Sequence, residues 1–119
     1  MIKTKRVYEQ VDENDGVRFF VERLWPRGIK KENLFMNAWL KDVSPSPELR
    51  SWYKHDLTKW VEFQQRYKAE LDENPDTWKP LIKAALEGNL TLLYAARDEE
   101  HNSALVLKNY LDKYLLINK

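Results

Sequence analysis

Apolar side chains occupy every second position from Val17 to Val21. This alternation of β-branched and aromatic residues with other side chains predicts a β-strand. Pro26 has no amide hydrogen to donate to a sheet, so we expect the strand to end near Trp25, with Gly28 in a turn. The residues at or beyond this strand end are Glu22, Arg23, Trp25 and Arg27. Open α/β sheets usually bind ligands at the carboxyl ends of their strands.

Two other segments have the composition of strands. Residues Ile2 to Tyr8 predict a first strand, and the sequence DENDG at residues 12–16 predicts a turn after it. A hairpin to Val17 is the simplest connection, and an irregular loop that leaves the two strands parallel is the alternative. Residues Leu90 to Ala96 form a nearly continuous apolar run, which is typical of a strand buried on both faces.

Spacings of three and four residues predict helices between and after these strands. Residues 29–41 fit a short helix or an irregular lid. Ser46, Pro47 and Glu48 form a typical helix start and predict a short helix over Glu48 to Tyr53. Asp56 is positioned to cap the next helix, whose apolar face comprises Leu57, Trp60, Phe63, Tyr67 and Leu71.

Two further helices complete the pattern. The first has Pro80 in its first turn, ends at Gly88, and presents Trp78, Leu81, Ile82, Ala85 and Leu86 on one face. The last helix is expected from about Glu99, with Ala104, Leu107, Leu111 and Tyr114 or Leu115 facing inward. Helices before and after the Leu90–Ala96 strand in the sequence predict an α/β fold. We expect one small domain over residues 1–119, with a few-stranded, largely parallel central sheet. Helices should cover this sheet in a Rossmann-like or flavodoxin-like layering.

Composition restricts the chemistry. The 119 residues include no cysteine, which excludes disulfides, zinc–thiolate sites and cysteine nucleophiles. The formal charge of +1 is not that of a typical nucleic-acid-binding protein, so basic character must be local. No stretch resembles a signal peptide or a membrane span, so we expect a cytoplasmic protein with no membrane partner. No cofactor motif is visible, and the isolated glycines form no phosphate-binding loop.

The two strand ends point to one site. If the strands ending near Trp25 and Ala96 are parallel neighbours, Arg23 and Arg27 meet residues at the end of the second strand and just beyond it, which are Tyr94, Arg97 and Asp98. The planar guanidinium group of arginine and the amino end of a helix both bind carboxylate or phosphate groups well. The sequence therefore predicts an anion-binding pocket at this edge. In the alternative interpretation Asp98 caps the last helix and Arg97 pairs with a surface carboxylate.

Proton transfer has fewer candidates. His55 and Asp56 are candidates for a proton-transfer unit, with Glu22 as a further acid or base; in the alternative interpretation the His–Asp pair forms a solvated turn or a cap arrangement. His101 is expected to be exposed rather than catalytic. No ligand spacing supports a metal site.

The segments KRVYE, ERLWPRG, WLKDVSPSPELRSWYKHD and TLLYAARDEEHN resemble the domain-of-unknown-function family 488, in its short YeaO-like branch. The resemblance covers nearly the whole chain and implies an α/β fold with the motif residues at one edge of a small sheet. It also implies that the polar motif residues of the family correspond to Arg23, Trp25, Arg27, Lys41, Arg50, His55, Asp56, Asp98 and Asn102 in this chain. Glu22 stands where an aspartate is usual, Leu57 where a proline is frequent, and Ser103 where a histidine is frequent.

Three functions fit these residues. The first is a hydrolase or transferase for an anionic small molecule such as a nucleotide or phosphoester, with arginines holding the anion and His55 or Glu22 moving protons. The second is a nucleic-acid-binding module, which the neutral charge balance disfavours. The third is an interaction subunit without chemistry. The chain is expected to be a monomer or a homodimer.

Overall fold

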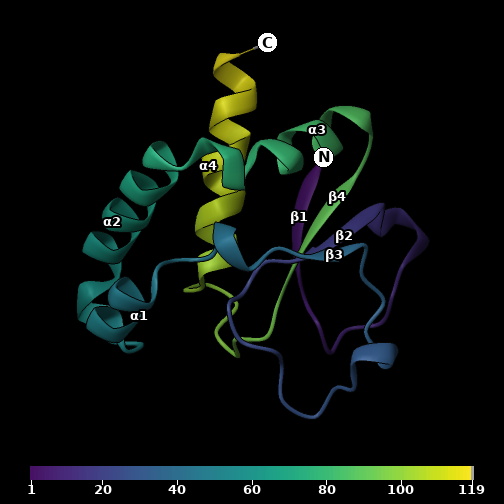
Figure 1. Ribbon diagram of the computed structural model, residues 1–119, viewed down its shortest axis with the longest axis horizontal. Coiled ribbons are helices and arrows are strands. Elements are labelled where there is room, and N and C mark those ends of the chain that lie inside the picture. The colour runs from purple at the N-terminus through teal and green to yellow at the C-terminus, as the bar shows by residue number, and fades with distance from the viewer. Residues whose placement is uncertain (119) are drawn as a thin grey trace.

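The computed structural model describes residues 1–118, and its strands form one four-stranded sheet in the order β1-β4-β2-β3 (Figure 1). The strands are β1 (Ile2–Arg6), β2 (Val17–Phe20), β3 (Ala38–Trp39) and β4 (Leu90–Tyr94). All three pairings are parallel, which confirms the predicted α/β class. All five residues of β4 are buried, and this apolar strand lies between β1 and β2.

The helices are α1 (Pro47–Tyr53), α2 (Trp60–Glu73), α3 (Lys79–Glu87) and α4 (Ser103–Ile117). The predicted start of α1 is confirmed, because the Ser46 hydroxyl accepts a hydrogen bond from the Leu49 amide at 3.1 Å. Asp56 caps a 3-10 turn, Leu57–Lys59, that leads directly into α2.

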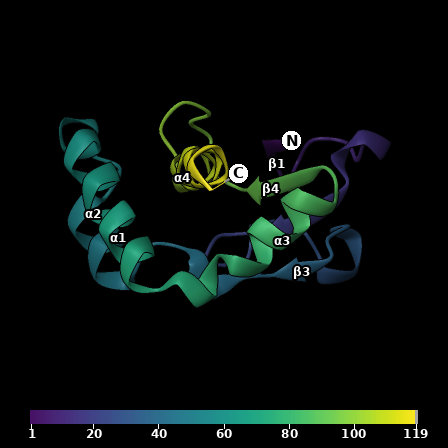
Figure 2. The ribbon, with the colours of Figure 1, turned by 90° about the horizontal axis from the view of Figure 1, so that it is seen from above.

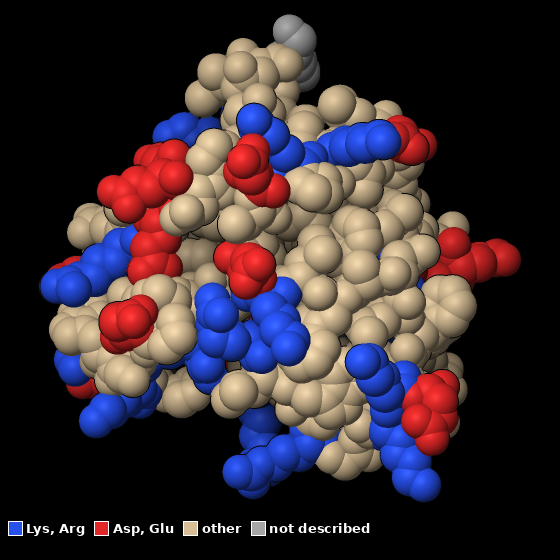
Figure 3. All heavy atoms as spheres, in the orientation of Figure 1, with Lys and Arg blue, Asp and Glu red and all other residues tan. Residues whose placement is uncertain are grey.

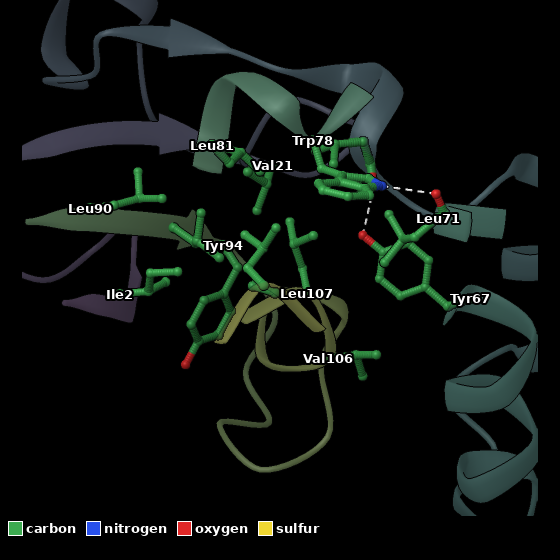
Figure 4. Close-up of a cluster of buried hydrophobic side chains, with 14 of the residues drawn as sticks. Ile2, Val21, Tyr67, Leu71, Trp78, Leu81, Leu90, Tyr94, Val106 and Leu107 are labelled. Carbon is green, nitrogen blue, oxygen red and sulfur yellow. Dashed lines mark hydrogen bonds between the residues drawn. The ribbon is translucent and has the colours of Figure 1, made fainter. Parts of the chain in front are cut away.

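All four helices contribute to one core on one face of the sheet. Leu90, Leu92 and Tyr94 of β4 belong to this core, together with the inward stripes of α2, α3 and α4. Seen from above in Figure 2, α1 and α2 stand apart from the strands, with α4 between them and β1. Figure 4 shows the Trp78 ring inside this core, where its nitrogen donates to the Leu71 carbonyl at 2.8 Å.

The opposite face is covered by the loop between β2 and β3. Phe20 and Leu93, which point away from the helices, form a second apolar cluster with Val7 and Leu34. This loop also contributes Trp25, whose ring packs edge-on against Phe20 at 5.7 Å and whose nitrogen donates to the Ile29 carbonyl at 2.6 Å. The segment that leaves β2 is thereby held in place without regular structure.

A buried charge network occupies the same face beyond this cluster. Asp15 is 1% exposed and accepts hydrogen bonds from Arg18 and from Lys5 at 3.2 Å, while the Lys3 ammonium lies 2.9 Å away. Gly16 follows with φ +64°, and a β-carbon there would lie 2.1 Å from the Asn89 carbonyl oxygen. These contacts fix the start of β2 against the start of β4.

Three local predictions need correction. The hairpin between the first two strands does not form, since β4 separates them, and the alternative irregular loop with parallel strands is the observed connection. Of the two alternatives for residues 29–41, the α-helix is wrong, and the segment is irregular apart from the 3-10 turn Lys31–Asn33 and strand β3. The last helix begins at Ser103, because Asn102 and not Asp98 provides its cap, accepting from the Leu105 amide at 2.9 Å.

The strand ends also differ from their predicted positions. Strand β2 ends at Phe20, before Trp25, and β4 ends at Tyr94, before Ala96. The residues after each strand are therefore loop residues that are free to turn toward a common site. Within residues 1–118, no helix combines the length and the apolar character that crossing a membrane requires.

Candidate functional site

A cleft of about 710 Å³ lies at the carboxyl ends of the parallel strands. Its walls come from the segments after β1, β2 and β4, from α1 and the following His55, and from the amino end of α4. Parallel pairing of β2 with β4 is what brings the segments after these two strands together, as the sequence predicted. Figure 3 shows Lys and Arg side chains gathered across the centre and lower part of the molecule, the end toward which β1 runs in Figure 1.

Five arginines line this cleft, which we call the arginine cleft: Arg6, Arg23, Arg27, Arg50 and Arg97. Among residues 1–118, none of the five forms an ion pair with a carboxylate; the seven ion pairs there use other cations. Arg6 is held by the carbonyls of Ala96, at 2.9 Å, and Ala95, at 3.1 Å. The cleft thus has a strong excess of positive charge.

Arg23 is the most enclosed of the predicted anion-binding arginines. Its Nε atom is buried and has no hydrogen-bond partner within the described part of the chain. A buried unsatisfied donor of this kind costs about 1–3 kcal/mol, so an acceptor supplied by a ligand would be stabilising.

Glu22 is the only acidic side chain that lines the arginine cleft in the described chain. Its Oε1 atom accepts a hydrogen bond from the Ala95 amide at 2.9 Å, which ties the end of β2 to the end of β4. Burial raises the pKa of Glu22, although the Ala95 amide and the nearby Arg50 and His55 oppose this effect. A carboxyl group with a raised pKa in a cleft is a candidate for proton transfer or ligand recognition.

His101, which was expected to be exposed rather than catalytic, is partly exposed and lines the cleft. Its Nδ1 atom lies 2.9 Å from Asp98 Oδ2, and its ring packs edge-on against Trp60 with 5.2 Å between centroids. The Glu100 amide, followed by the ring and amide of His101, holds the pKa of Asp98 below its usual range. This carboxylate orients the imidazole, an arrangement that suits acid–base chemistry.

His55 reaches the cleft through an unusual backbone. Lys54 and His55 have φ angles of 49° and 57°, so two consecutive residues other than glycine adopt the left-handed conformation. Each such residue costs on the order of 1 kcal/mol or more, and strain of this kind clusters at functional sites. The adjacent Asp56 does not line the cleft; it caps the following turn, accepting from the Thr58 amide at 3.0 Å.

The structure brings most of the predicted site together. The predicted residues that line the cleft are Glu22, Arg23, Trp25, Arg27, Arg50, His55, Arg97 and Asn102. Three others lie outside its lining: Tyr94 is buried in the core, Asp56 is a cap, and Asp98 acts through His101. Lys41, from the family pattern, packs on the Trp39 ring at 4.1 Å instead of entering the cleft.

Sequence reasoning missed Arg6 and Tyr53 as cleft residues and discounted His101. The available signal for Arg6 was its place at the carboxyl end of the first strand, beside the end of its parallel neighbour. No group of three or more metal-ligating side chains is arranged to hold an ion within residues 1–118. The amino end of α4, at Asn102 and Ser103, adds its positive dipole end to the cleft.

Comparison with known proteins identifies close relatives. A family model described as "Inactive DUF488-N3 subclade" matches residues 1–119. The uncharacterized protein YeaO of Escherichia coli is 42% identical over 110 residues, which cover 92% of this chain and 96% of that protein. The uncharacterized proteins Mb3100c of Mycobacterium bovis and Rv3073c of Mycobacterium tuberculosis are each 38% identical over 111 residues, 93% of both chains. No solved structure matches the chain.

Proposed function

Because the chain belongs to the DUF488 family, in a subclade described as inactive, we propose that it binds a small phosphate-bearing molecule, a phosphoester or nucleotide, in the arginine cleft. The observation that carries this proposal is the set of five arginines around one cleft, none paired with a carboxylate of residues 1–118. Guanidinium groups are planar donor forks that match phosphate oxygens.

The size and walls of the cleft support a small ligand. A volume of about 710 Å³ lies within the range of small-molecule sites, roughly 300–1,000 Å³. Beside the arginines, Tyr53 and Phe63 supply apolar rings, stacked with 4.4 Å between their centroids. A ligand with a phosphate and an apolar or cyclic body would use both kinds of wall.

Catalysis is the second candidate function, and one observation favours it. His101 is oriented by Asp98 at 2.9 Å and shares the cleft with Glu22, whose pKa is raised by burial. A hydrolase or transferase could use such groups to move protons. Because the subclade is described as inactive, we prefer the binding function to the catalytic one.

Isothermal titration calorimetry with inorganic phosphate, adenosine monophosphate and a short single-stranded DNA tests the proposal. We expect the first two to bind, and Arg50→Gln to weaken binding at least about tenfold, since a hydrogen bond to a charged group contributes about 1.5–3 kcal/mol. Arg66→Gln is the matched control, because it removes the same charge from a surface pair with Glu62 on α2, away from the cleft.

Salt dependence separates the small-anion site from the nucleic-acid alternative. A single phosphate contact gives a shallow loss of affinity with salt, whereas a protein that neutralises many phosphates loses affinity steeply. Tight, steeply salt-dependent binding of the DNA alone would favour the nucleic-acid module. If no anion binds and Arg50→Gln changes nothing, the proposal is wrong and the interaction subunit becomes the better hypothesis.

A further inference from the structure

One carboxylate in the arginine cleft needs an explanation that anion binding does not provide. Glu22 lies among five arginines and two histidines, and an ionised carboxylate repels the phosphate that the arginines attract. A cleft built for inorganic phosphate alone would bind it better without this side chain. The bond from the Ala95 amide that ties β2 to β4 occupies only part of the carboxylate, and the remaining acceptor positions suit a second group on the ligand.

Glu22 is also prevented from turning away. The Ala95 amide holds its Oε1 atom at 2.9 Å. Its own carbonyl accepts from the Trp39 indole at 2.7 Å, which fixes the backbone at this position. An ionised carboxylate has about four acceptor positions on its two oxygens, so these contacts leave capacity for a ligand donor.

We propose that Glu22 selects ligands in which a hydroxyl group lies close to the phosphate, as in a phosphorylated polyol or sugar. The proposal rests on the phosphate-binding function proposed above and adds the class of ligand. Glu22 accepts a hydrogen bond from the hydroxyl while the arginines hold the phosphate. An ammonium group would also suit a carboxylate, but five surrounding arginines repel it, so a neutral donor fits better.

The test uses a matched pair of ligands, glycerol 3-phosphate and n-propyl phosphate, which share a phosphate and a three-carbon chain and differ in two hydroxyl groups. Calorimetry measures both affinities, and that of inorganic phosphate, for the unaltered protein, Glu22→Gln and Glu22→Met. We expect the unaltered protein to prefer glycerol 3-phosphate at least tenfold. Both variants should bind n-propyl phosphate as tightly or more tightly and lose most of the preference.

Two controls keep the result interpretable. Glu22→Gln retains an oxygen that can accept from the Ala95 amide, so it preserves the fold if Glu22→Met does not, and amide NMR dispersion checks both. Glu62→Gln, on the exposed side of α2, removes one negative charge outside the cleft and should leave the preference intact.

The failure of this inference differs from the failure of the proposed function. If inorganic phosphate and both esters bind but the unaltered protein shows no preference, or Glu22→Gln keeps all of it, the role of Glu22 is refuted and phosphate binding stands. If none of the three ligands binds, phosphate binding and the inference both fall.

Discussion

Asp15→Asn tests the buried charge network that joins the first two strands to β4. Asp15 is 1% exposed, and its carboxylate faces Lys3 at 2.9 Å, Lys5 at 3.2 Å and the guanidinium of Arg18, which is itself 1% exposed. The substitution keeps the size of the side chain but removes the negative charge that these three cations share. Arg18 would then be a buried charge without its carboxylate partner.

The cost follows from the burial of the pair. Breaking a buried ion pair by neutralising one partner typically destabilises a protein by about 3–5 kcal/mol. The amide oxygen that Asp15→Asn introduces can still accept one hydrogen bond, so we expect the lower end, about 3 kcal/mol. For a chain of this length that loss lowers Tm by roughly 12 °C.

Urea unfolding followed by circular dichroism measures this difference. The matched control is Asp76→Asn, since Asp76 is 94% exposed and pairs with Lys79 at 3.4 Å on the surface. Exposed pairs contribute about 0–1 kcal/mol, so the control should unfold close to the unaltered protein. If Asp15→Asn costs no more than Asp76→Asn, the reasoning about this network is refuted.

The same network predicts an acid dependence. Burial alone would raise the pKa of Asp15, but hydrogen bonds from Lys3, the Asp12 amide, Lys5 and Arg18 outweigh it and hold the pKa well below its usual range. A lowered pKa in the folded state contributes stability above the unfolded pKa of about 3.9, and this contribution is lost as pH falls toward the folded value. Stability below pH 4 should therefore fall less steeply in Asp15→Asn than in the unaltered protein.

Substitutions at three further positions test individual contacts, each by urea unfolding. Gly16→Ala should destabilise by more than about 1 kcal/mol, because its β-carbon would collide with the Asn89 carbonyl and because φ is positive; an unchanged midpoint would contradict this. Tyr67→Phe should cost about 1–3 kcal/mol, since it removes the 2.6 Å hydrogen bond to the buried Val43 carbonyl, and a neutral effect would mean that this carbonyl finds another donor. Ser46→Ala should cost about 1 kcal/mol through loss of the α1 cap, and Ser46→Asn should restore most of it.

Local patterns were sufficient to predict the helices and the central strand. The spacing of Phe63, Tyr67 and Leu71 identified the buried face of α2, and all three are buried. Leu57, which was predicted on the same face, is instead exposed in the 3-10 turn before the helix. The cap at Ser46 was equally visible, because capping depends on a few adjacent residues. The start of α4 was misplaced because both Asp98 and Asn102 are good caps, and only the path of the loop after β4 decides between them.

The candidate site was predictable where it depends on strand ends. Arg23, Arg27 and Arg97 follow β2 and β4, and parallel pairing alone brings them to one edge. His101 could not be assigned, because its place in the cleft depends on Asp98 and on the edge-on contact with Trp60 of α2, about forty residues earlier in the chain.

The sequence by itself determined the four helices apart from the start of α4, three of the four strands, and the edge of the sheet where charge collects, because periodicity, caps and strand ends are properties of neighbouring residues. Only the tertiary structure decided strand order and the partners of the buried charges. Arg18 is a charged residue in a largely apolar strand, yet it is only 1% exposed and pairs with Asp15, because the start of β4 passes beside both. Contacts between distant segments depend on how the whole core closes, and no local pattern contains that information.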